Sequence, residues 1–342
     1  MAKAAHRRWL LPVAVNAGAV ILAVGVFALW KGLQPAPQPP QLEGTITQGF
    51  NQTVDDLGYI PAASKRVTAR RVSDGKVIYD VAYTTGPSGF RVVPKANVKP
   101  EACVLLFGDS FTFGEGVNDG DTFAAQIVTQ SAGRVAADNF GFSGYGPHQF
   151  LAGLQSGRFQ KDATCTPTDA VYLLIMDHVG RAVGRTIWDK HGPRYRLAPD
   201  GKPLRDGNFD SAGAPPPPPE PDEGLLGWRR WLLGASNTGT PEEARLSAAL
   251  LIEGARALKQ AWPNIRFHLI DWDAYDNVRL NEMVHDLKAA RIDVRPLSAI
   301  LPDYLDHLDR YQIAPGIEGH PNPAAHKRIA AYILHEIVGK KP

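Results

Sequence analysis

Short apolar runs alternate with amphipathic segments along the C-terminal two thirds of the chain. Apolar runs of strand length cover residues 104–107, 135–140, 171–176, 265–270 and 292–294. Segments with helical periodicity separate or follow them, at 122–131, 148–155, 240–261, 278–290 and 322–338. This strand–helix alternation predicts an α/β fold with a parallel sheet covered by helices on both faces.

A different pattern precedes that region. Residues 66–72 and 76–84 alternate between apolar and polar positions and are separated by Asp74-Gly75, which predicts a β-hairpin. We expect residues 43–98 to form a small β-rich module that packs on the main domain, residues 99–342, in a structural role. Residues 180–239 interrupt the main domain's pattern. We expect an ordered cap over 181–206 and disorder over 208–224.

The N-terminus carries an uncharged apolar segment. Residues 9–30 contain no charged side chain and would span about 33 Å as a helix, which is enough to cross a bilayer. Lys3, Arg7 and Arg8 precede it, which favours a cytoplasmic location for residues 1–8. A cleaved signal peptide is the alternative. In either case the proline-rich linker 31–42 and all that follows lie outside the cytoplasm.

Charge and sequence motifs argue against several functional classes of protein. The net charge of +2 on 342 residues, with basic side chains scattered, gives no indication of nucleic-acid binding. The histidines lack zinc-site spacing, and neither a P-loop nor a dinucleotide fingerprint is present, so we expect no cofactor and no metal.

The first strand of the main domain ends in Gly108-Asp109-Ser110. Open α/β sheets place their chemistry at the carboxyl ends of parallel strands, and a serine there becomes a nucleophile when a base is near. His320, far downstream, has a pKa suited to that task. The alternative for Ser110 is an ordinary turn at a strand end.

Three sequence blocks occur in the order found in a known family: Gly108-Asp109-Ser110, the glycine-rich block 139–146, and His320-Pro321-Asn322. Over about residues 100 to 340 the chain resembles the SGNH/GDSL hydrolases. The resemblance implies a flavodoxin-like three-layer α/β sandwich and a triad with Ser110 as nucleophile and His320 as base. It also implies an oxyanion hole that includes the backbone amides of Ser110 and Gly144.

Two positions depart from the family pattern. The usual aspartate three residues before the histidine is Ile317 here, so we assign Glu318 as the acid; a site with only Ser110 and His320 is the alternative. The usual third oxyanion donor, an asparagine, is replaced by Asp177 and His178. A neutral His178 or a protonated Asp177 could donate, or both residues could merely cap the strand end.

The flavodoxin-like order would make the strands that follow Cys103 and Cys165 neighbours, with both cysteines at the edge opposite Ser110. Outside the cytoplasm they can form a disulfide. Two buried free thiols are the alternative.

Together these observations predict a serine esterase that acts through an acyl-Ser110 intermediate on small-molecule esters or on O-acyl esters of cell-envelope glycans or lipids. The expected location is a bacterial inner membrane, crossed once, with the main domain in the periplasm. An O-acyltransferase with the same acyl-enzyme, or a non-catalytic glycan-binding or assembly protein on this scaffold, are the alternatives.

Overall fold

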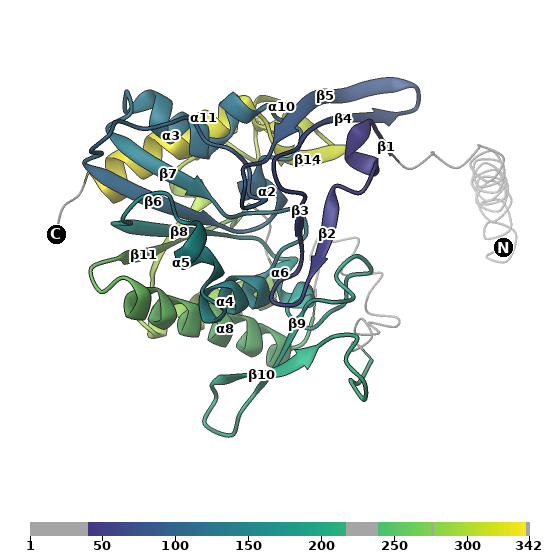
Figure 1. The fold of residues 1–342 in the computed structure, drawn as a ribbon, viewed down its shortest axis with the longest axis vertical. Coiled ribbons are helices and arrows are strands. Elements are labelled where there is room, and N and C mark those ends of the chain that lie inside the picture. The colour runs from purple at the N-terminus through teal and green to yellow at the C-terminus, as the bar shows by residue number, and fades with distance from the viewer. Residues whose placement is uncertain (1–39, 217–238, 275–276, 340–342) are drawn as a thin grey trace, which may run out of the picture.

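A five-stranded parallel sheet forms the centre of the computed structural model, which describes residues 40–216, 239–274 and 277–339 (Figure 1). Its strands, in chain order, are β6 (Ala102–Phe107), β7 (Val135–Asn139), β8 (Asp169–Leu174), β11 (Arg266–Asp271) and β12 (Asp293–Pro296). Across the sheet they lie in the order β12-β11-β8-β6-β7. Counted along the chain this is the flavodoxin-like order 2-1-3-4-5, with its switch point between β6 and β8. All five predicted strands are confirmed.

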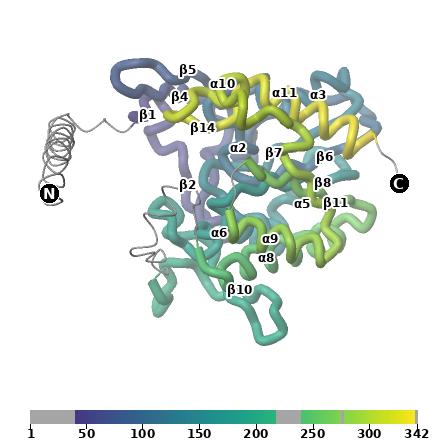
Figure 2. Tube along the Cα trace, turned by 180° about the vertical axis from the view of Figure 1, so that it is seen from behind, coloured from purple at the N-terminus to yellow at the C-terminus, as the bar shows by residue number. Residues whose placement is uncertain are grey.

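Helices cover both faces of the sheet, as Figures 1 and 2 show from opposite sides. One layer holds α4 (Pro147–Gln155), α8 (Pro241–Ala261) and α9 (Val278–Ala289); the other holds α3 (Phe123–Gln130) and α11 (Pro323–Tyr332), which continues as a π-helix over Ile333–Val338. Successive residues of β6 pack on opposite faces of the sheet. Leu105 lies in the core beneath α4 and α8, and Leu106 lies in the core beneath α3 and α11. Among the described residues, the other helices are single turns or little more: α2 (Ser110–Phe113), α5 (Arg158–Asp162), α6 (His178–Arg181) and α10 (Leu308–Tyr311). There are also 3₁₀ turns at Thr45–Thr47, Asp119–Asp121 and Leu297–Ala299.

The N-terminal β-rich module comprises strands β1 to β5. A three-stranded antiparallel sheet contains β1 (Gln41–Glu43), β4 (Arg66–Ser73) and β5 (Lys76–Thr84), and a separate hairpin pairs β2 (Asn51–Val54) with β3 (Gly58–Pro61). The predicted hairpin over 66–84 is therefore confirmed. Two hydrogen bonds show that the module lies at the carboxyl ends of the parallel strands. Tyr59 Oη donates to Ser143 O, in the loop after β7, at 2.7 Å, and Tyr83 Oη accepts from Gly116 N, in the loop after α2, at 2.8 Å.

The insertion after β8 contains an ordered hairpin of β9 (Pro193–Leu197) and β10 (Pro203–Asn208). This hairpin packs beside α4 and α8. The loop before it is fixed by Asp189, a fully buried carboxylate that accepts hydrogen bonds of 2.7 Å from both His148 and Gln149. The β9–β10 part of the expected cap thus lies beside a helical layer, whereas Trp188, in the loop before it, lies next to Gly144. The segment 208–224, expected to be disordered, is described only as far as residue 216.

The predicted transmembrane segment, residues 9–30, lies outside the described residues. Within the described part of the chain, no helix combines the length and the apolar character that a bilayer span requires.

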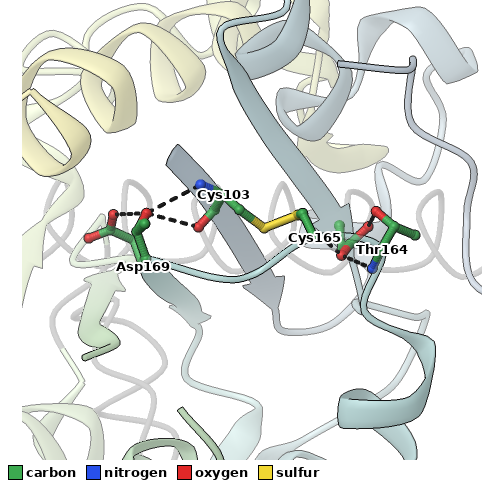
Figure 3. Close-up of a disulfide and its surroundings, with 6 residues drawn as sticks. Cys103, Thr164, Cys165 and Asp169 are labelled. Carbon is green, nitrogen blue, oxygen red and sulfur yellow. Dashed lines mark hydrogen bonds between the residues drawn. A yellow bond between two sulfur atoms is a disulfide. The ribbon is translucent and has the colours of Figure 1, made fainter. Parts of the chain in front are cut away.

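Cys103 and Cys165 form a disulfide, with their Cα atoms 6.1 Å apart (Figure 3). Cys103 lies at the start of β6, at the opposite end of that strand from Ser110, and Cys165 lies in the loop that leads into β8. Thr168 reinforces the junction by donating through Oγ1 to the carbonyl oxygen of Cys103 at 3.1 Å. The bridge therefore fastens the amino ends of the two central strands.

Replacing both cysteines with alanine should lower the free energy of unfolding by about 4 kcal/mol, because the bridge closes a long loop in the unfolded chain. Guanidinium unfolding of the double variant and the oxidised parent measures the difference. In the unfolded, unreduced parent neither thiol should react with an alkylating reagent. Alkylation of both would show that the bridge does not form.

Candidate active site

Ser110 is positioned by a sharp turn between β6 and α2. Gly108 has φ of 139°, and a β-carbon there would lie 2.4 Å from Thr112 Oγ1 and 3.0 Å from the carbonyl oxygen of Leu173. Only glycine fits this turn. Asp109 then caps α2, accepting from Phe111 N at 3.0 Å through Oδ1. Ser110 becomes the first residue of α2, at the carboxyl end of a central strand, as the sequence predicts.

His320 and Glu318 come from a hairpin of β13 (Gln312–Ala314) and β14 (Glu318–Pro321). His320 Nε2 lies 2.8 Å from Ser110 Oγ, and its Nδ1 contacts Glu318 Oε1. Residues two apart in a strand face the same side, which lets the glutamate reach the ring from this spacing. Asn322 anchors the hairpin, because its side chain donates to Arg310 O and Gln312 O and caps α11 through Oδ1. The structure therefore brings Ser110, His320 and Glu318 together.

The surroundings of His320 favour its protonated form. Burial alone would lower the pKa of its imidazole, but the hydrogen bond to Glu318 and the negative charge of Glu115 outweigh that effect and raise the pKa above its ordinary value. Burial would raise the pKa of the Glu318 carboxyl, yet the contacts with His320 and with Arg71 leave that pKa below its usual range. Glu318 is thus a carboxylate at neutral pH.

A buried ion pair lies directly behind the turn that carries Ser110. Asp109 Oδ2 accepts from Arg181 Nη1 at 2.7 Å, and the same nitrogen donates to Tyr145 O at 3.0 Å. Despite full burial, Arg181 holds the pKa of Asp109 well below its usual range. This pair ties the loops after β6 and β7 to α6. Loss of either partner would leave the other charge buried without compensation.

His178 belongs to that buried region, and the structure does not bring it into the site. Its side chain is fully buried, with Nε2 3.6 Å from Asp109 Oδ2 and Nδ1 3.3 Å from Tyr172 Oη. Burial lowers the pKa of its imidazole. The chain turns into α6 immediately after β8, which directs this ring inward, so His178 is not placed to donate to an oxyanion.

Asp177 does lie at the mouth of the site. Its side chain is 54% exposed, its Oδ2 is 3.6 Å from Arg181 Nη2, and it lines the same cavity as His320. A carboxylate in an ion pair accepts hydrogen bonds and repels developing negative charge. The third oxyanion donor sought in the sequence is therefore supplied by neither residue 177 nor residue 178.

The amides of Ser110 and Gly144 remain as donors. Neither N–H has a hydrogen-bond partner in the described part of the chain. Gly144 has φ of 82°, and a β-carbon there would lie 2.2 Å from Trp188 Nε1 and 2.6 Å from Tyr59 Oη. Only glycine can occupy this point, where the insertion loop and the N-terminal β-rich module both approach the backbone. Ser143, just before it, donates to Glu115 Oε2 at 2.7 Å.

Two cavities flank the site. One of about 220 Å³ reaches His320 and Glu318 and is lined chiefly by apolar side chains: Phe111, Ile175, Met176, Trp272, Leu280 and Tyr304. The other, of about 430 Å³, lies under the N-terminal β-rich module and has a mixed lining that includes Tyr79, Glu115 and Ser143. Among the described residues, one group of potential metal ligands gathers, Cys103, Asp138 and Cys165, and the disulfide occupies both sulfurs.

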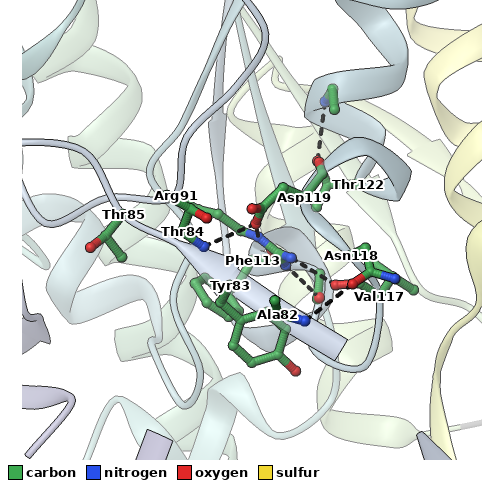
Figure 4. Close-up of polar contacts among 12 residues, drawn as sticks. Ala82, Tyr83, Thr84, Thr85, Arg91, Phe113, Val117, Asn118, Asp119 and Thr122 are labelled. Carbon is green, nitrogen blue, oxygen red and sulfur yellow. Dashed lines mark hydrogen bonds and ion pairs between the residues drawn. The ribbon is translucent and has the colours of Figure 1, made fainter. Parts of the chain in front are cut away.

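Besides Arg181, two further arginines near the site were not predicted from the sequence. Arg91, which is 3% exposed, donates to the carbonyl oxygens of Phe113, Gly114 and Val117 at 2.6–2.8 Å and pairs with Asp119 at 3.0 Å (Figure 4). It thereby fixes the loop that follows Ser110. Arg71, on β4, places Nε 3.0 Å from Glu318 Oε2. The sequence offered one weak signal for each: Arg91 stands among apolar residues, and Arg71 lies on the inward face of a predicted strand.

Comparisons with known proteins give matches of low identity among solved structures only. No protein-family model and no curated protein matches the chain. Solved structures that match include a member of the lipolytic protein G-D-S-L family from Veillonella parvula, 14% identical with a TM-score of 0.40, over 69% of this chain and 98% of the other. A variant of an acetyl-xylooligosaccharide esterase from Geobacillus Stearmophilus is also 14% identical, with a TM-score of 0.40 over 71% and 97% of the two chains. Function therefore has to be argued from the site itself.

Proposed function

We propose that this protein is a serine esterase. The observation that carries the proposal is the continuous contact from Ser110 Oγ to His320 Nε2, at 2.8 Å, and from His320 Nδ1 to Glu318. A hydroxyl paired with an imidazole that is itself oriented by a carboxylate is the arrangement required for acyl transfer through a serine. A protein that only binds glycans has no need for this alignment.

In the proposed reaction, His320 Nε2 accepts the proton of Ser110 as Oγ bonds to the ester carbonyl carbon. The amides of Ser110 and Gly144 stabilise the oxyanion of the tetrahedral intermediate. The intermediate collapses when His320 gives its proton to the departing alcohol oxygen, leaving an acyl-Ser110 ester. Water, deprotonated by His320, then attacks that ester and releases the carboxylic acid and free Ser110. Glu318 keeps the Nδ1–H tautomer and stabilises the imidazolium.

The two cavities support a division of the substrate. The apolar cavity beside His320 has the size and lining for a short acyl chain, and the mixed cavity beside Ser143 suits the polar alcohol portion. We propose O-acyl esters of cell-envelope glycans or lipids as substrates. The uncharged segment 9–30 supports an extracytoplasmic location next to a membrane, and so does the disulfide, since such bridges persist in oxidising compartments.

Transfer of the acyl group to a sugar hydroxyl is a second candidate, favoured by the size of the mixed cavity, which could hold an acceptor alcohol. The two reactions can be distinguished by supplying a short-chain acyl donor together with an oligosaccharide and identifying the products by mass spectrometry. Free acid as the main product supports the esterase, and acylated oligosaccharide supports the transferase.

Ser110→Ala should abolish both hydrolysis of a short-chain aryl ester and labelling by a fluorophosphonate probe, because it removes the nucleophile and leaves the fold intact. Ser156→Ala is the matched control, since Ser156 is an exposed serine that bonds Asp56. Turnover and labelling rates are measured alongside circular dichroism. A folded Ser110→Ala protein that still hydrolyses the ester would overturn the assignment.

Glu318→Gln should lower kcat by about a hundredfold or more while KM changes little, because tautomer control matters as charge develops on the imidazole. Glu318→Asp keeps the charge on a shorter arm and should lose less. Steady-state kinetics on the same aryl ester measure both. Wild-type kcat in Glu318→Gln would mean that Ser110 and His320 work without this acid.

A further inference from the structure

The N-terminal β-rich module contributes a charged side chain to the environment of His320. Arg71 Nε lies 3.0 Å from Glu318 Oε2, the oxygen that His320 does not use, and its Nη1 lies 3.8 Å from Glu115 Oε1. Glu318 is 4% exposed, so this contact is shielded from water. One guanidinium therefore contacts two of the carboxylates whose charge acts on the imidazole.

The local structure of β4 directs Arg71 inward. Val67 and Ala69 are buried on one face of the strand, and Arg71 continues that face by alternation. The pairing of β4 with β5 shifts register between Arg71 and Val72. A bulge of this kind redirects side chains near functional sites. The preceding Arg70 faces the other way, where it pairs with Glu43 at 3.0 Å and Asp80 at 3.8 Å.

We propose that Arg71 is a positioning residue of the active site, which fixes the Glu318 carboxylate against His320 and offsets the negative charge that surrounds the imidazole. The inference rests on the proposed serine chemistry and assigns the N-terminal β-rich module a part in it. Oε1 contacts His320 and Oε2 forms an ion pair with Arg71, so each oxygen of the carboxylate has a partner. Without Arg71, Oε2 would be a buried charge with no partner.

The charges that face His320 come from several elements. Glu318 lies on its own strand, Asp109 and Glu115 flank α2, and Asp177 lines the adjoining cavity. The cations are Arg71, from β4, and Arg181, which is committed to Asp109. Removing the charge of Arg71 leaves the imidazole in a more negative setting, which stabilises its protonated form. A protonated His320 cannot accept the serine proton, so the acidic limb of the rate profile should move to higher pH.

The second-order rate of fluorophosphonate labelling at Ser110, followed from about pH 5 to about pH 9, tests this without knowledge of the substrate. Arg71→Gln should shift the acidic limb upward by about half a unit to one unit, which makes labelling below the limb about threefold to tenfold slower. Arg71→Lys should restore the limb but lower the plateau about threefold, because an ammonium cannot hold two carboxylates in a fork. Arg70→Gln is the control and should match the wild type.

An Arg71 that only fastens the module to the main domain would give a different result. Arg71→Gln would then melt at a lower temperature yet keep the wild-type limb, and that outcome overturns the proposal, as does an equal shift in Arg70→Gln. If Arg71→Gln does not fold, the Arg71→Lys plateau decides, and a wild-type plateau overturns the positioning role. Absence of labelling in the wild-type protein would instead refute the serine chemistry on which the inference rests.

Discussion

The hydrogen bond between Ser110, at the start of α2, and His320, on β14, joins residues that are 210 positions apart in the sequence, and the rest of the fold holds these two segments together. Parallel strands place the loops that follow them at one edge of the sheet, so β6 delivers Ser110 to that edge without long connections. The β13–β14 hairpin brings His320 to the same point just before α11 begins. A hydrogen bond tolerates little displacement, which requires both segments to be fixed by contacts of their own.

Buried charges provide much of that fixation. Arg181 holds Asp109 behind Ser110, and Arg91 holds the carbonyl oxygens of the loop in front of it. Each arginine reaches the turn from a different element, and each would leave unpaired charge in the interior if its partners moved. The rigidity of the Ser110 turn thus results from ion pairs and carbonyl contacts, while the apolar cores on the two faces of the sheet hold the strands themselves.

The features of the site that could be predicted from the sequence are those set by residues close together in the chain. Ser110 and the turn around it are encoded by adjacent residues, and Glu318 reaches His320 because two strand positions separate them; both features were accessible from spacing. The direction of α6 after β8 could not be predicted from the sequence. That direction determines that His178 is buried while Asp177 faces the cavity. Arg71 could not be placed at all, since its contact with Glu318 depends on how the N-terminal β-rich module docks.

The five strands of the parallel sheet and the β4–β5 hairpin were predictable because their periodicity is strong. The packing of the β9–β10 hairpin beside the helices was not predictable, because the loop before it is held by the buried contacts of Asp189.

In the proposed mechanism Ser110 carries the acyl group during the reaction. Rapid mixing with a short-chain aryl ester, followed by acid quenching and by intact-mass and peptide analysis, detects this intermediate. We expect a transient mass increase of one acyl group, located on the peptide that contains Ser110 and lost as turnover completes. Ester hydrolysis with no acylated protein at any time, or with the acyl group on another residue, would contradict it.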